Sequence, residues 1–351
     1  MAGVTGRTVK MAFAKFATNS WNVAASVTKG VYFKSDAGMN YSPEVIEDKS
    51  FGNLFVGPSA RGNINAIDLT LEGQSRYDDN TYIFDALAMG SPSVALSTSF
   101  TGAVTSWKHI FDLANNTDGL GVTVAIDKNQ FVEELTSAKV YGWTEKNDAG
   151  VMTSSYKVLG SAITIASSIN ITSTLAVATY PTLGNWCLKN QGVWRMNAQG
   201  GAGLAAGDTN NFVESVDFTW ARPQDQSFGF GSANILEPAD NEFPSFTLKL
   251  GFARMNTVSA NSLRVGIAAN TAYKADWTFS GSLINSTDSY QKKYEFPYLE
   301  LTEFSDDVES AGQVKPSATF VARLPAAAPT GMTVTKPFRL TRIMVNSVVA
   351  F

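Results

Sequence analysis

The amino-acid sequence predicts a mainly β protein with two tandem domains, each a β-sandwich or a small barrel with few helices. Apolar and polar residues alternate over short segments, a period that places apolar side chains on one face of a strand. Turn-forming residues separate these segments, because the chain contains 28 Gly and 12 Pro. A length of 351 residues is more than one hydrophobic core usually covers, so two domains are expected.

A repeated segment supports the two-domain prediction. Asp48–Gly52 reads Asp-Lys-Ser-Phe-Gly, and Asp225–Gly229, nearly half the chain further on, reads Asp-Gln-Ser-Phe-Gly. An alternating strand follows each copy, at Ile67–Leu71 and at Phe246–Leu250. We interpret this pattern as a duplicated β domain, a common origin of rings and stacks of like parts. The alternative is two unrelated β domains that share a pentapeptide by coincidence.

The predicted domains are residues 1–160 and 161–351, with an approximate boundary between 154 and 190. Alternating apolar residues indicate strands in both domains. The segment that joins the domains is rich in Ile, Thr and Ser and is predicted to form one or two strands. The predicted strands lie at 107–111, 122–126, 158–175, 216–220, 246–252, 277–279 and 299–301.

Helical periodicity is rare in this chain. Thr81–Met89 is predicted to form a helix, because Asp78 and Asp79 before it suit the positive end of a helix dipole. Gly90 can then adopt the left-handed conformation that ends a helix. A second, weaker helix is predicted at 130–138. At least the first domain is therefore expected to carry a helix packed on its strands.

Two segments are predicted to be long loops. Residues 196–211 contain four Gly among Ala and Asn, and residues 305–328 mix acidic residues with Gly and Pro. Long loops in a compact domain usually serve a function or move freely. We expect residues 196–211, or the region 100–116, to contact a neighbouring chain. The alternative is that each is a plain surface loop.

Composition argues against several classes of function. The net charge is −4, and no basic cluster is larger than the Lys292-Lys293 pair, so tight binding to nucleic acid is not expected. The chain begins without an apolar signal segment and contains no apolar run long enough for a membrane helix. Cys187 is the only cysteine, which excludes an intrachain disulfide. These features predict a chain that is made in a reducing cytoplasm and does not enter a membrane.

The residues that usually carry catalysis are scarce. His109 is the only histidine, and the apolar residues around it predict a strand position rather than a catalytic base. Cys187 is predicted to be a buried apolar residue, and no metal-ligand spacing is present. The glycines of 201–207 lack the spacing of a phosphate-binding loop. Carboxylate pairs need only proximity in space, which the sequence leaves open. We predict no catalytic, cofactor-binding or metal-binding residues.

Several segments resemble the tail tube proteins of long-tailed bacteriophages. In the first half the resemblance covers 46–90, where an acidic-Ser-Phe segment leads through a hairpin to an alternating strand and a helix ending in Gly90. In the second half it covers the strands Phe212–Arg222 and Phe246–Phe252 and the segment Gly229–Gly231 followed by Ile235–Pro238. The resemblance consists of diffuse strand patterns over most of the chain between 45 and 304.

The resemblance implies a fold and a role. Tail tube proteins are β-sandwich modules with a flanking helix, and six modules form a ring around a channel. Rings stack into a hollow tail through which DNA is ejected without specific binding. The resemblance implies no enzymatic activity and no cofactor. Its implied location is the tail of the virion, with contacts to the tape measure protein and other tail proteins.

Two domains in each chain suggest the number of chains in a ring. Six modules require three such chains, so we expect a homotrimer with pseudo-six-fold symmetry and head-to-tail contacts. The alternative is a homohexamer in which one domain forms the channel and the other decorates the outside. Cross-linking and native mass measurement would distinguish them.

Two other classes of function stay open from sequence alone. A carbohydrate-binding, receptor-binding or decoration protein of a virion is the main alternative, because aromatic residues form 11% of the chain and can stack on sugars. The tryptophans lie in strand-like segments, however, where packing in a core is the usual role. A β-rich hydrolase is less well supported, because there is a single histidine.

Overall fold

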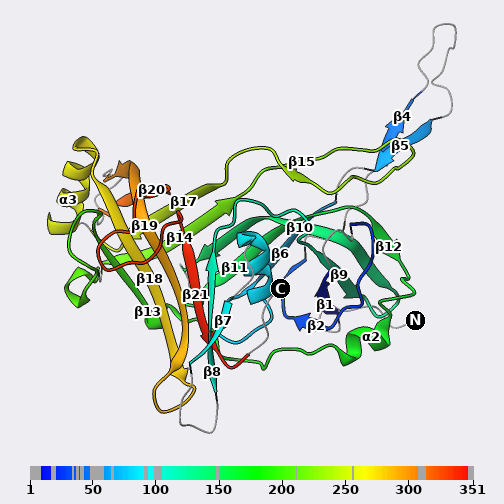
Figure 1. Cartoon of the computed structure of the whole chain (residues 1–351), viewed down its shortest axis with the longest axis horizontal. Coiled ribbons are helices and arrows are strands. Elements are labelled where there is room, and N and C mark those ends of the chain that lie inside the picture. The colour runs from blue at the N-terminus through cyan, green and yellow to red at the C-terminus, as the bar shows by residue number, and fades with distance from the viewer. Residues whose placement is uncertain are drawn as a thin grey trace, which may run out of the picture.

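Long antiparallel strands make up most of the chain in the computed structural model (Figure 1). This confirms the predicted mainly β, sandwich-like fold. The structure describes residues 9–16, 21–33, 35–36, 39, 43–47, 59–64, 67–90, 94–98, 105–147, 150–210, 212–254, 257–306 and 314–346.

We call the strands β1 to β12 and helix α1 the first unit. Its principal ladder has the order β1-β9-β10-β11-β6-β3, and every pairing is antiparallel. The strands are β1 (Lys10–Lys15), β2 (Lys29–Val31), β3 (Ser35–Asp36), β4 (Pro43–Ile46), β5 (Ala60–Ile64), β6 (Ile67–Gln74), β7 (Val94–Thr98), β8 (Ser106–Asp112), β9 (Val122–Asp127), β10 (Val132–Lys146), β11 (Thr153–Gly160) and β12 (Ile163–Ile165), and α1 is Tyr82–Met89.

We call the strands β13 to β21 and helix α3 the second unit. Its principal ladder has the order β13-β18-β19-β20-β17-β14, again antiparallel throughout. Helix α2 (Thr172–Val177) and the short 3-10 helix η2 (Lys189–Gln191) connect the units. The elements are β13 (Gly192–Ala198), η3 (Ala206–Asp208), β14 (Val213–Ala221), β15 (Gln224–Asp225), β16 (Ala239–Asp240), β17 (Ser245–Phe252), α3 (Thr257–Ala268), β18 (Ala272–Leu283), β19 (Ser289–Ser305), β20 (Ser317–Ala322) and β21 (Arg339–Met344).

The strands of the two principal ladders are equivalent one by one. Reading the two ladders together pairs β1 with β13, β3 with β14, β6 with β17, β9 with β18, β10 with β19 and β11 with β20. The hairpin β4–β5 corresponds to β15–β16, and β12 corresponds to β21, since each pairs with the first half of the longest strand in its unit. The chain visits these positions in the same sequence in both units.

The register repeats as well. Leu69 of β6 faces Val158 of β11, and at the equivalent positions Leu248 of β17 faces Phe320 of β20. The numbers of the two equivalent leucines differ by 179 (248 − 69). The two hairpins have the same offset, because the β4–β5 ladder and the β15–β16 ladder superpose when 179 is added to each residue number.

A ladder irregularity recurs at the equivalent place in each unit. The β10–β11 ladder shifts between Val140 and Gly142, and the β19–β20 ladder shifts between Leu301 and Glu303. The offset in residue number is 161 on both sides of the shift (301 − 140 and 303 − 142). A bulge is a local distortion that strand pairing does not require, so unrelated sheets have no reason to share one at the same position. Its recurrence supports the interpretation of the halves as copies, although the division at residue 160 stays a prediction.

The offset of the repeated pentapeptide differs from that of the ladders. Asp225 lies in β15, and Asp48–Gly52 lies outside the described residues. The pentapeptides have an offset of 177 (225 − 48), whereas the strands around them have an offset of 179. The two pentapeptides are therefore not at equivalent positions, although the strands that follow them are.

Helix α1 forms where the sequence predicts it. Every side chain of the helix is buried, and Gly90 ends it with φ 66°, in the left-handed region. Asp79 accepts hydrogen bonds from the backbone N–H of Thr81 at 3.2 Å and from its hydroxyl at 2.6 Å. Helix α3 occupies the equivalent place after β17, and the sequence did not predict it.

The two units are joined into one branched, open network of strands. β10 pairs with β14 along Gly142–Lys146, on the edge opposite β11. β21 pairs with β8, which lies in an insertion (β7–β8) that the second unit lacks between α3 and β18. Within the described residues these pairings do not close into a ring, so neither unit is a closed barrel.

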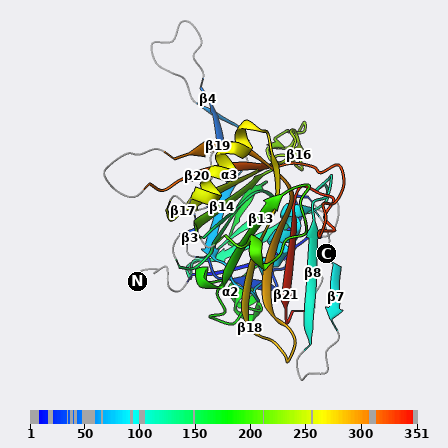
Figure 2. The same cartoon turned by 90° about the vertical axis from the view of Figure 1, so that its left-hand side faces the viewer.

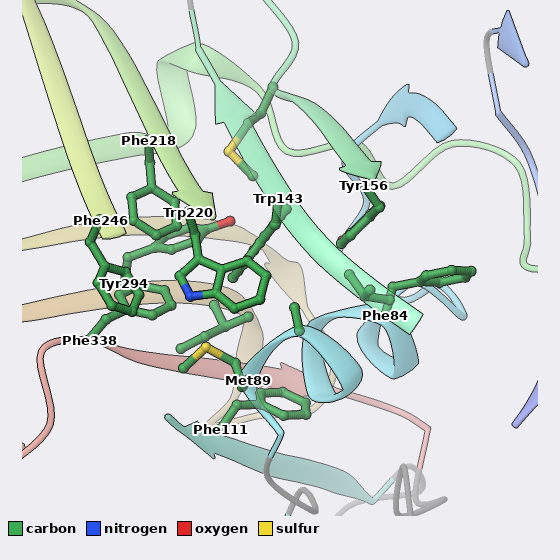
Figure 3. Close-up of a cluster of buried hydrophobic side chains, with 14 of the residues drawn as sticks. Phe84, Met89, Phe111, Trp143, Tyr156, Phe218, Trp220, Phe246, Tyr294 and Phe338 are labelled. Atoms are coloured by element: carbon green, nitrogen blue, oxygen red, sulfur yellow. The ribbon is translucent and has the colours of Figure 1, made fainter. Parts of the chain in front are cut away.

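One hydrophobic core runs through both units. Trp143 of the first unit packs on Phe218, Tyr294 and Phe338 of the second, with ring centroids 5.6, 6.2 and 5.9 Å away. Figure 3 shows these rings converging from different strands, with α1 against the same cluster through Met89. The halves are therefore copies in topology that share a single core.

Three predicted segments differ from the structure. Residues 158–175, predicted to form one or two strands, contain the end of β11 and β12, but helix α2 begins at Thr172. Residues 130–138, predicted as a weak helix, lie mostly in β10, because a hairpin turn pairs them with β9. Asn129 takes the left-handed conformation at that turn, with φ 64°, and its N–H bonds to Asp127. The loop predicted at 305–328 is wrong over β20 (Ser317–Ala322), whose Ala318 and Phe320 are buried in the core, and its residues 307–313 lie outside the described residues.

The loop prediction at 196–211 holds only in part. Residues 196–198 belong to β13, and η3 follows, with turns between them. The region 100–116 likewise contains β8. Whether either region contacts a neighbouring chain stays a prediction.

Candidate functional site

His109 occupies the strand position that the sequence predicts. It lies in β8, fully buried, beside the rings of Tyr82 and Phe111 at centroid distances of 5.4 and 6.4 Å. Its Nε2 lies 2.7 Å from the carbonyl oxygen of Asn346. Burial lowers the pKa of His109 below its ordinary value of 6.5. The imidazole is therefore a neutral group in a packed interior at neutral pH.

Cys187 is buried, as the sequence predicts. Its nearest polar partner is the hydroxyl of Ser75, with 3.8 Å between Oγ and Sγ. Burial raises the pKa of the Cys187 thiol to about 12. Because the thiolate is the reactive form, this thiol stays protonated and unreactive at neutral pH.

The other features that suggested chemistry lie apart from one another. Gly201 lies in a turn, and its carbonyl accepts a 2.8 Å hydrogen bond from the buried Lys274. Asp306, the first residue of the acidic run 306–309, pairs with Arg264 at 3.2 Å. Among the residues that the structure describes, no group of three or more His, Cys, Asp and Glu is placed to hold a metal ion.

A buried ion-pair network ties the second unit to the helix of the first. Arg342 of β21 contacts Asp79 at 2.9 Å and Asp85 at 2.8 Å, and all three side chains are buried. It also donates to the backbone carbonyls of Arg76 and Tyr77 at 2.7 and 3.1 Å. Burial alone would lower the pKa of Arg342, but the two carboxylates outweigh it and the pKa lies above its ordinary value.

A second buried ion pair lies at the junction of the two sheets. Lys292 of β19 donates to Glu145 of β10 at 2.7 Å, and neither side chain is exposed. Ser154 and the indole Nε1 of Trp143 also donate to Glu145, at 2.8 and 3.0 Å. Burial raises the pKa of Glu145, and Lys292 opposes the shift. With partners on both of its oxygens, this carboxylate is a structural group.

The junction itself is a continuous ladder between β10 of the first unit and β14 of the second. Thr144 of β10 faces Thr219 of β14, and Trp143 faces Trp220. At the outer end Lys146 and Asp217, the latter on β14, form an ion pair at 3.1 Å. An ordinary sheet therefore crosses from the first unit to the second.

The segment β15–β16 and the residues around it (222–244), here called the second arm, leave the junction and lie on the first unit (Figure 1). Lys139 of β10 donates to the carbonyl of Pro238 at 2.7 Å and pairs with Glu237 at 3.3 Å. Glu237 also accepts from the N–H of Gly119 at 2.6 Å. Contact with the arm leaves only 1% of the Lys139 side chain exposed.

Apolar contacts also hold the second arm. Ile235 is completely buried, and its carbonyl accepts a 3.0 Å hydrogen bond from the indole of Trp21. Arg222, at the base of the arm, donates to the carbonyl of Ala114 at 2.7 Å. The arm is thus part of the packed surface of the first unit.

Among the described residues, nothing covers the equivalent surfaces of the second unit in this way. After Glu300 the edge of β19 that faces away from β20 has no strand partner in the described part of the chain. β3 likewise pairs only with β6 within the described residues. The hairpin β4–β5, here called the first arm, points away from the body. Figure 1 shows it at the end of the molecule opposite α3, and Figure 2 shows it standing clear of the sheets.

The tryptophans bear on the carbohydrate-binding alternative. Trp143, Trp194, Trp220 and Trp277 are buried, so their faces pack within the protein. Trp186 is 41% exposed, and the guanidinium of Arg76 lies 5.9 Å from its ring centroid. The described tryptophans do not form an exposed aromatic platform of the kind that stacks on sugars.

Comparisons with known proteins give no assignment. No protein-family model matches the chain, and no curated protein is similar to it. Within the described residues, no helix has both the length and the apolar character needed to cross a membrane. The geometry of the two units is therefore the basis on which we infer a function.

The sequence did not reveal the residues of the junction and the second arm as a site. Lys139, Glu237 and Arg222 are isolated charges in the sequence, without a motif. Only the internal repeat could have pointed to them. Once the ladders of the two units are aligned, each of these residues has an equivalent position in the other unit. No short-range pattern marks them, because their partners lie far away along the chain.

Proposed function

We propose that this chain is a structural protein of a virion, the major tail tube subunit of a long-tailed bacteriophage. Three chains form a ring of six units, and rings stack around a channel through which DNA is ejected. The channel passes DNA without specific binding, in keeping with a net charge of −4. The tape measure protein and other tail proteins are the expected partners, and the virion tail is the expected location.

One observation carries this proposal: the chain contains one sheet junction between equivalent units and leaves the same two edges open at its ends. β14 of the second unit covers β10 of the first. The equivalents of these strands are β3 and β19, and neither has that partner in the described part of the chain. If β3 of a second copy pairs with β19 of the first, the contact repeats the β14–β10 junction and joins the two chains head to tail. Such contacts close into a ring when the rotation allows it, and a closed ring leaves no open sheet edges.

The internal junction specifies the register between chains. Thr144 faces Thr219. The equivalent of Thr144 is Ser305 (144 + 161). The β3–β6 and β14–β17 ladders set the other offset at 180, since Ser35 corresponds to Ser215 (215 − 35). The equivalent of Thr219 is then Met39 (219 − 180). Ser305 of one chain is expected to face Met39 of the next.

A cross-link tests this register. The double variant Ser305→Cys with Met39→Cys should give covalent trimers with a short bis-maleimide, because facing β carbons lie about 5 Å apart in an antiparallel ladder. Each single variant serves as a control, and the buried Cys187 should stay unmodified. Cross-linking of the double variant no greater than that of the single variants would contradict the register.

Electron microscopy and native mass measurement test the function itself. The purified wild-type protein should form rings or stacked tubes with three chains in each ring. Rings of six chains would favour the hexamer and refute the trimer. Dispersed monomers at every concentration would contradict the proposal and favour a virion decoration or receptor-binding protein.

A further inference from the structure

The two arms differ in charge at equivalent positions, and so do the surfaces that they reach. Asp240 of the second arm corresponds to Arg61 of the first (240 − 179), because the pair Gln224–Asp240 in one ladder matches Val45–Arg61 in the other. Lys139 of β10, which the second arm covers, corresponds to Glu300 of β19 (139 + 161). Within the second arm Asp240 pairs with Arg222 at 3.4 Å, and it lies two residues beyond Pro238, whose carbonyl accepts the hydrogen bond from Lys139. The acid of the second arm is thus a base in the first arm, and the base on β10 is an acid on β19.

The first arm is exposed in the single chain. Arg61 is exposed on β5, and Val45 and Ile46 of β4 are 59% and 52% exposed. A two-stranded hairpin is marginally stable in water unless its side chains pack on something. Exposed apolar side chains on such a hairpin therefore indicate that another body covers it.

The described residues also leave the receiving surface partly exposed. Glu300 keeps 39% of its side chain exposed, against 1% for the equivalent Lys139. Glu300 pairs with Arg323 at 3.0 Å in an exposed contact, which contributes little in water. Beside Glu300, the turn at Asn270 (φ 51°) corresponds to the turn at Gly119 (φ 73°), which receives Glu237 in the first unit. The equivalence follows from the offset of 151 between the β9 and β18 ladders, the difference between 270 and 119.

We infer that the first arm of one chain docks on the second unit of a neighbouring copy, with Arg61 next to Glu300. This inference rests on the proposed ring, because it assigns a contact within that assembly. The docking repeats the position of the second arm on β10, with the charges of Asp240 and Lys139 exchanged at Arg61 and Glu300. The reversal also makes each arm specific for one unit. If the first arm took the place of the second, its Arg61 would approach the like charge of Lys139.

Charge exchange tests the inference. Arg61→Glu and Glu300→Arg should each raise the protein concentration for half-maximal ring formation by about tenfold or more, because each places like charges together. The double variant should restore assembly toward the wild-type level. Lys157→Glu makes a comparable reversal from base to acid on β11, whose two edges are already paired, and should assemble as the wild type does.

Each outcome separates the arm contact from the ring. Native mass measurement gives the assembled fraction, and thermal unfolding verifies that every variant folds as the wild type does. If the wild type forms rings and the single variants assemble equally well, the arm inference is wrong and the proposed function stands. A double variant that assembles no better than the single variants also overturns the inference. A wild-type protein that forms no rings overturns the proposed function and the arm contact together.

Discussion

The first and second units share a strand order and a bulge, and they differ in what covers the same surfaces. β14 and the second arm cover β10 of the first unit, whereas β19 of the second unit has neither cover in the described part of the chain. Lys139 is buried as a result, and its equivalent Glu300 is partly exposed. The fold of a unit does not require the cover, since the second unit forms without it. In the proposed ring, this difference makes the second unit the end that receives another copy.

A second difference concerns the electrostatics of the two helices. α1 is held by the buried network of Arg342 with Asp79 and Asp85, which connects it to a strand of the other unit. α3 has an exposed pair instead, between Arg264 and Asp306 at 3.2 Å. Charged groups are costly to bury, so the network depends on the two ion pairs that Arg342 makes. α1 is therefore fixed by contacts between the units, and α3 mainly by packing on β19.

The largest expected effect follows from breaking the buried network. Arg342→Met leaves two buried carboxylates without their cation and should lower the free energy of unfolding by about 3–5 kcal/mol. Arg264→Met removes the exposed pair of α3 and should cost less than about 1 kcal/mol. Guanidinium unfolding followed by circular dichroism measures both. Equal losses in the two variants would show that the helices are anchored alike.

The shared core predicts cooperative unfolding of the two units. Leu69→Ala in β6 and Leu248→Ala in β17 remove equivalent buried side chains, and each should cost about 2–5 kcal/mol. Because one core contains both residues, either variant should shift a single transition for the whole chain. Calorimetry of both variants against the wild type measures this. Two separate transitions, each moved by only one variant, would show that the units fold independently.

A smaller effect, on the pH dependence of stability, comes from the β7–β8 insertion that only the first unit carries. His109 of β8 has a pKa below 6.5 when folded, because it is buried, so the unfolded chain takes up the proton more readily. The contribution of His109 to stability is complete above pH 6.5 and is lost as the pH falls toward its folded pKa. Titration of this one group changes the free energy of unfolding by at most about 1.4 kcal/mol per pH unit.

The variant His109→Gln isolates this contribution. Its free energy of unfolding should change less than that of the wild type between pH 7.5 and pH 5.5, since glutamine does not titrate. Urea unfolding at both values measures the difference. Equal pH dependence in the two proteins would mean that His109 takes up its proton as easily when folded as when unfolded.

The sequence by itself determined the local elements. Alternating apolar residues placed β14, β17 and β18, and acidic residues before Thr81 with Gly90 after Met89 placed α1, because these patterns act over a few neighbouring residues. The apolar surroundings of His109 and Cys187 also predicted their burial. The equivalence of Leu69 and Leu248 followed from the two similar strands.

Tertiary structure decided the remainder. Residues 132–138 became strand because β9 pairs with them, and α3 formed from a segment of mostly small and polar residues because Leu263 packs into the core. The exposure of Glu300 and the burial of Lys139 depend on which strand lies beside each. Partners on neighbouring strands can lie far away in the chain, so a local pattern cannot encode them. The sequence determined which residues face inward, and the fold alone decided which strand edges are covered within the described part of the chain.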